Sequence, residues 1–153
     1  MMKRLLIIGS GEKEDIDIQA DHDIMVINLE IYNYPYAEHF VSVHNPLKTK
    51  DTLNDDIQYH VCRYFQDNIN ARYWDWHNPG GTSGLFALHV GIHLGYDKVA
   101  LYGVPLSNEY GTRIILHAWY EYIRKNKEAC KKARSYSGKT LKLLGKAEGW
   151  FDA

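Results

Sequence analysis

The sequence has few cysteines, no long apolar run and almost no net charge, and each absence excludes a class of protein. The two cysteines, Cys62 and Cys130, lack the spacing of zinc or redox motifs, so we expect reduced thiols in a cytoplasmic protein without structural metal. No apolar segment approaches the roughly 18 residues of a membrane span, which argues against a membrane partner. A formal net charge of -1 gives no electrostatic reason to expect nucleic acid as a partner.

The composition that remains is typical of a globular domain. The chain has 153 residues, of which 45% are hydrophobic, and this is enough to bury a core within one domain spanning residues 1–153. The opening "MMKRLLIIGSGEKED" contains a short apolar run followed by acids, so we interpret it as a first strand and not as a signal peptide. The composition leaves homo-oligomerisation open.

Short apolar runs that end in turn residues alternate with segments of helical spacing. This alternation predicts an α/β domain of Rossmann-like type, with a mainly parallel sheet flanked by helices. A basic polar loop and a short helix are expected in the tail. The expected strands are residues 4–8, 24–27, 40–44, 71–76 and 99–102, and the expected helices are residues 53–65, 84–94 and 113–127.

Polar residues follow several of these strands. In parallel sheets, ligands bind at the carboxyl ends of the strands, so we expect these residues to share one edge and to form a nucleotide site. The side-chain amides of the asparagines among them can form hydrogen bonds with a base or a ribose, although asparagine is also a common turn residue. The residues are Gly9, Ser10 and Gly11 after the first strand, Asn28 after the second, Asn45 after the third, and the turn of Thr82, Ser83 and Gly84.

The glycine turn after the first strand is half of a dinucleotide fingerprint. The third glycine of that fingerprint would fall at position 14, which is Glu14, and the neighbouring acids Glu12 and Asp15 would repel a pyrophosphate. NAD is therefore excluded as the expected ligand. The backbone N–H groups of the turn suit a mononucleotide phosphate, and an ordinary strand-to-helix turn explains the same residues equally well.

The turn at Thr82, Ser83 and Gly84 also has two explanations. Its hydroxyls can cap the following helix, or its N–H groups can bind a phosphate or a ribose. Downstream, "SYSGKT" lacks the first glycine and the preceding strand of a P-loop. Arg134 and Lys139 in this region are either phosphate contacts or part of a solvated basic loop.

The histidines give weaker signals. His89 and His93 share a helix face in "HVGIH", but the segment lacks the glutamate of a zinc-protease helix, so we expect packing and no metal. His77, just before the Gly80 turn, is a candidate catalytic acid or base together with Tyr110.

Taken together, "IIGSG", Asn28, "HNP" at residues 44–46 and "GTSGLFALHVGIHLGYDKVALYGVPL" resemble the CMP-binding domain of bacterial, Campylobacter-type sialyltransferases. The match covers most of residues 4–106. The chain is also similar to small glycosyltransferase-like, pterin-pyrophosphokinase-like and phage proteins. The resemblance implies contacts to a cytidine-type nucleotide or nucleotide-sugar at Gly9, Gly11, Asn28, Asn45, Thr82, Ser83 and Gly84.

The sequence also departs from this family. Pro105 and Ser107 stand where the family has an aspartate and a tyrosine, no histidine follows His117, and the chain is too short for the sialic-acid lid. The resemblance therefore implies the nucleotide pocket without sialyl transfer. Three functions remain open: a small nucleotide or nucleotide-sugar transferase, a non-catalytic protein of phage type that senses or sequesters a nucleotide, and an interaction protein with an aromatic surface.

Overall fold

Every strand pair in the computed structural model is parallel, which confirms the predicted Rossmann-like α/β class. The structure describes residues 1–18, 21–43, 56–62, 71–78, 80, 82–106 and 113–152. The seven strands form one sheet in the order β5-β4-β3-β2-β1-β6-β7. Their bounds are β1 Arg4–Ile8, β2 Asp23–Ile27, β3 His39–Ser42, β4 Gln58–Val61, β5 Ala71–Tyr73, β6 Lys98–Tyr102 and β7 Ala133–Ser135.

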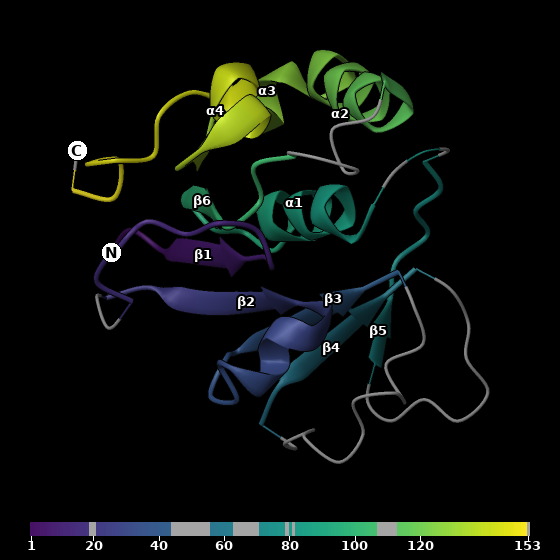
Figure 1. The fold of residues 1–153 in the computed structure, drawn as a ribbon. Coiled ribbons are helices and arrows are strands. Elements are labelled where there is room, and N and C mark those ends of the chain that lie inside the picture. Colours follow the sequence, from purple (N-terminus) through teal and green to yellow (C-terminus); the bar gives the residue numbers. More distant parts are fainter. Residues whose placement is uncertain are drawn as a thin grey trace.

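One face of the sheet is covered by helices in two layers. Helix α1 lies directly on the sheet, and α2 lies beyond it (Figure 1). The sequence explains this order, because α1 is apolar on nearly all sides, whereas α2 is amphipathic and buries Trp119 and Tyr122 toward α1. The helices are η1 Asn28–Tyr32, α1 Ser83–His93, α2 Arg113–Lys125, α3 Lys127–Cys130 and α4 Gly138–Leu144. Within the described ranges, no helix has the length and apolar character to cross a bilayer.

The central strands are buried on both faces, as the apolar run at residues 4–8 predicts for a parallel sheet. Leu5 and Ile7 contribute to the core beneath α1, while Leu6 and Ile8 contribute to the core on the opposite face. The predicted strands at residues 4–8, 24–27 and 99–102 and the helices at 84–94 and 113–127 are confirmed to within about two residues, a usual uncertainty for element ends.

The strands predicted at residues 40–44 and 71–76 are present but shorter, because β3 ends at Ser42 and β5 ends at Tyr73. Two further predictions for local structure are wrong. Residues 58–61 form strand β4 and not part of a helix, because this segment pairs with β3 and β5, and Tyr59 packs on Phe40 with ring centroids 5.6 Å apart. Residues 133–135, predicted as a loop, form β7 by pairing with β6. In both cases pairing with a neighbouring strand decided the structure. The rest of the predicted helix at residues 53–55 and 63–65 lies outside the described residues.

Candidate functional site

The structure brings Asn28 and Ser83 together at the carboxyl edge of the sheet. Asn28 follows β2, and Ser83 is the first residue of α1. The Oδ1 atom of Asn28 accepts hydrogen bonds from Ser42 Oγ at 2.7 Å and Ser83 Oγ at 3.4 Å. Ser83 Oγ in turn accepts the N–H of Val43 at 3.1 Å. We call Asn28, Ser42 and Ser83 the amide cluster.

The backbone at Asn28 contributes to this geometry. Its φ is 54°, in the left-handed region that asparagine tolerates better than most residues. The chain therefore turns sharply from β2 into η1. The two serines of the amide cluster are only 3% and 6% exposed, so water has little access to their hydroxyl groups. Ser42 was not among the predicted site residues, because a serine within an apolar strand carries no distinguishing signal.

The glycine turn lies against the end of β6. The N–H groups of Gly9 and Gly11 donate to the carbonyl oxygens of Tyr102 and Gly103, both at 2.8 Å. A Cβ atom on Gly11 would lie 2.4 Å from Pro105 Cδ, so glycine permits a close approach here. Since both N–H groups have partners, we expect a ligand at this turn to contact exposed Ser10, which lies between them.

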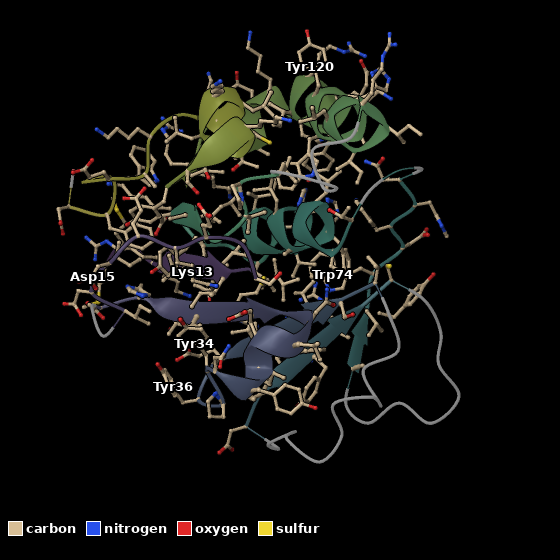
Figure 2. The ribbon with its side chains drawn as sticks, viewed as in Figure 1. Lys13, Asp15, Tyr34, Tyr36, Trp74 and Tyr120 are labelled. Atoms are coloured by element: carbon tan, nitrogen blue, oxygen red, sulfur yellow. The ribbon has the colours of Figure 1, made fainter. Side chains whose placement is uncertain are left out.

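A cation and a buried carboxylate flank the same edge. Lys13 Nζ donates to the carbonyl oxygen of Gly11 at 3.2 Å and lies 3.7 Å from Glu30 Oε1. Glu30 is 8% exposed and also accepts from Asn33 Nδ2 at 3.3 Å. Lys13 is labelled beside β1 in Figure 2. Acids dominate the sequence around this turn, and the lysine among them was not predicted as a site residue.

The start of α1 explains two further predicted residues. Thr82 is the N-cap but forms no side-chain cap bond with the described residues, and its carbonyl oxygen accepts the N–H of Phe86 at 3.0 Å. A Cβ atom on Gly84 would lie 3.2 Å from Val104 Cγ1 and 3.3 Å from Trp119 Cζ2. Gly84 therefore faces the protein interior, and its absence of a side chain serves packing between α1, β6 and α2.

The two predicted basic contacts lie at different places. Lys139 lies in the first turn of α4, and its N–H donates to the carbonyl oxygen of Pro105 at 2.8 Å, just beyond the carboxyl end of β6. Arg134 instead points toward the amino end of β7. Its guanidinium donates to the carbonyl oxygens of Lys131 and Ala133, both at 2.8 Å, and stacks 4.2 Å from the Trp150 ring. The structure does not bring Arg134 to the amide cluster.

His77 lies on the segment between β5 and α1. Its side chain is 80% exposed, and Nε2 is 3.5 Å from Asp75 Oδ1. This position leaves the imidazole open to solvent. The predicted residues Asn45 and Tyr110 lie outside the described residues, as do the "HNP" motif and Ser107.

His89 has the packing role predicted for this pair, whereas His93 is exposed and contacts His89. His89 Nδ1 is bonded to the hydroxyl of Tyr122 at 2.7 Å, and His93 Nδ1 donates to the carbonyl oxygen of His89 at 2.8 Å. Burial, together with nearby His93, lowers the pKa of His89 to about 4. Among the residues with described positions, no group of three or more potential ligand side chains could hold a metal ion.

A second polar network, which the sequence did not indicate, runs between the sheet and α1. The nitrogen atoms of His39 and His60 are 3.0 Å apart, and His39 Nε2 is 2.9 Å from the hydroxyl of Tyr96. Tyr96 donates to Asp23 Oδ2 at 2.5 Å. His39, Tyr96 and Asp23 line a cavity of about 280 Å³ at the amino ends of the strands, away from the amide cluster.

Comparison with known proteins gives one structural relationship. No protein-family model and no curated protein matches the chain. The structure is similar to that of the sialyltransferase CstII from Campylobacter jejuni in complex with a substrate analogue, cytidine-5'-monophosphate. The TM-score is 0.56 at 15% sequence identity, and the match covers 95% of this chain and 85% of that chain. This likeness shows the fold alone.

Proposed function

We propose that this chain binds a cytidine-type nucleotide or nucleotide-sugar at the carboxyl edge of its sheet. The observation that carries the proposal is the contact between Asn28 and Ser83, which are 55 positions apart and 3.4 Å from each other. The sequence independently predicts both residues as nucleotide contacts. The CMP bound to the structurally similar sialyltransferase supports the same class of ligand.

The charges around the edge favour a ligand with few phosphates. The first N–H groups of α1 offer positive potential to one phosphate, and Lys13 adds a charge that Glu30, 3.7 Å away, partly compensates. The acids Glu12, Glu14 and Asp15 are exposed next to the glycine turn and would repel further phosphates. A nucleoside monophosphate, or a monophosphate linked to a sugar, therefore fits the charge pattern better than NAD.

We propose binding without sialyl transfer, and the open alternative is a small transferase acting on the same ligand. Transfer would need an acid or base, for which His77 and Tyr110 are the candidates, with Lys139 stabilising the leaving phosphate. His77 is largely exposed and has Asp75 as its described polar partner. Turnover of a nucleotide-sugar by the purified protein would separate this alternative from a binding protein.

Isothermal titration calorimetry against CMP, CDP, UMP, AMP and NAD tests the proposal. We expect the tightest binding for a cytidine nucleotide, and a loss of roughly five- to tenfold in Asn28→Ala, the size expected for one hydrogen bond with a polar partner. Gln58→Ala, which removes an exposed side-chain amide at the amino end of β4, is the matched control. Binding of NAD with no binding of any mononucleotide would disprove the proposal.

A further inference from the structure

We propose that Ser42 and Ser83 are positioning residues that fix the side-chain amide of Asn28, with its Nδ2 toward the ligand. The ligand group recognised at Asn28 is therefore a hydrogen-bond acceptor. This inference rests on the proposed function and extends it, because it assigns a chemical class to one part of the ligand and a role to Ser42.

The first step is that Asn28 Oδ1 is saturated. An amide oxygen has two lone pairs, and here it accepts from two hydroxyl groups, Ser42 at 2.7 Å and Ser83 at 3.4 Å. Ser83 Oγ accepts the N–H of Val43 with one lone pair and donates its hydroxyl hydrogen to Asn28 Oδ1. A rotation of the amide by half a turn would put the donor Nδ2 in the place of Oδ1, so both hydroxyl hydrogens would lose this acceptor.

The second step is that the two serines are shielded from water. Ser42 is 3% exposed and Ser83 is 6% exposed, so solvent cannot easily replace a lost hydroxyl partner. The three residues belong to three different elements, because Asn28 begins η1, Ser42 ends β3 and Ser83 begins α1. The orientation of the amide is therefore set by the packing of these elements and not by the local sequence.

The third step concerns the free side of the amide. Among the described residues, none accepts a hydrogen bond from Nδ2 of Asn28, which is only partly buried. An NH₂ group donates and cannot accept. It suits a base carbonyl oxygen, an unprotonated ring nitrogen or a ribose oxygen, and it disfavours an exocyclic amine at the same place.

Matched variants of Ser42 test the positioning role. Ser42→Thr keeps the hydroxyl group. Ser42→Val introduces a side chain of nearly the same shape as threonine but without the hydroxyl group. We expect Ser42→Thr to bind CMP within about twofold of wild type, and Ser42→Val to bind roughly five- to tenfold more weakly, the effect of one hydrogen bond. Melting temperatures of the two variants serve as the control for folding. Equal affinity of the Thr and Val variants would overturn the role of Ser42.

Ligand analogues test the acceptor. The affinity of CMP is compared with that of 2′-deoxy-CMP, 2-thio-CMP and 3-deaza-CMP, each of which removes or weakens one acceptor, and with that of cytidine, which lacks the phosphate. We expect one analogue to lose affinity in wild type but not in Asn28→Ala, which identifies the acceptor that faces Nδ2. If no analogue shows this coupling, the assignment of an acceptor at Asn28 is wrong.

A measurement without ligand separates this inference from the proposed function. The side-chain NH₂ signals of Asn28 are assigned by their loss in Asn28→Asp, and nuclear Overhauser effects are recorded in the free protein. We expect no strong effects to the β protons of Ser42 and Ser83, because Nδ2 points away from them. Strong effects would overturn the amide orientation. Absence of nucleotide binding to wild type would instead disprove the proposed function.

Discussion

The Nε1 atom of Trp74 donates a hydrogen bond of 3.0 Å to Nδ1 of His60, and this bond fixes the tautomers of the whole buried network. An indole N–H only donates, so His60 Nδ1 must accept, and neutral His60 carries its proton on Nε2. His60 then donates to His39 Nδ1, and His39 donates through Nε2 to Tyr96. Each group therefore donates a hydrogen bond to the next, from Trp74 through His60, His39 and Tyr96 to the carboxylate of Asp23.

The neutral state of His60 and His39 predicts that the protein loses stability in mild acid. Burial, reinforced by nearby His39 and Arg72, lowers the pKa of His60 from 6.5 to about 3. Burial also lowers the pKa of His39. Below about pH 6.5 these histidines become protonated in the unfolded chain but stay neutral in the folded protein. The free energy of unfolding therefore falls as the pH drops from 6.5 toward 3.

For His60 alone, the expected loss in unfolding free energy between pH 7 and pH 5 is ~2 kcal/mol. Urea denaturation at several pH values measures it. His117→Gln, which alters an exposed histidine, is the control and should keep the same slope. Equal unfolding free energies at pH 5 and pH 7 would contradict the neutral, buried state of His60.

We expect Trp74→Phe to lower the unfolding free energy by about 1–3 kcal/mol, because it leaves His60 Nδ1 buried without a donor. The substitution also weakens the stacking of Arg72, whose guanidinium lies 4.2 Å from the Trp74 ring centroid. Figure 2 shows Trp74 next to the strands labelled β3 and β5 in Figure 1. In a His60→Leu background the cost should shrink, and an undiminished cost would show that the hydrogen bond contributes little.

The glycine turn gives a third prediction, for stability. Gly11→Ala places a methyl group 2.4 Å from Pro105 Cδ and 2.8 Å from the carbonyl oxygen of Gly103. We expect a loss of roughly 1–3 kcal/mol from this overpacking. Gly84→Ala, with contacts of 3.2 Å and 3.3 Å, should cost less and should leave nucleotide affinity unchanged, since Gly84 faces the interior. Thermal melting of the two variants, compared with wild type, measures both effects.

The last prediction concerns catalysis. We expect no transfer of sialic acid from CMP-sialic acid to a sugar acceptor, because Pro105 stands where the sialyltransferases that the sequence resembles have an aspartate, and residues 118–153 contain no histidine. Mass spectrometry of acceptor sugars after incubation with donor and protein detects transfer. Sialylated acceptor formed at an enzyme-like rate would refute this expectation, whereas slow hydrolysis of the donor would not.

The class of the fold and the edge that carries the candidate site follow from the amino-acid pattern alone. Apolar runs such as residues 4–8 and 99–102 end in turn residues, and this signal is local, because it reflects which side chains a buried strand accepts. The pattern also places Asn28 and Ser83 at one edge, since the carboxyl ends of parallel strands share an edge in any such sheet. Neither conclusion depends on contacts between distant segments.

Other features depend on how distant segments meet in the folded chain. Ile57 and Val61 fit helical spacing and strand alternation equally, and pairing with β3 made residues 58–61 a strand. For Arg134 the sequence left a phosphate contact and a solvated loop open, whereas β7 pairs with β6 and the Arg134 guanidinium stacks on Trp150. The role of the Ser42 hydroxyl and the direction of the Asn28 amide also depend on such contacts. Hydrogen bonds and packing between elements select one of several locally acceptable conformations. The sequence of a single strand or helix does not determine which of them forms.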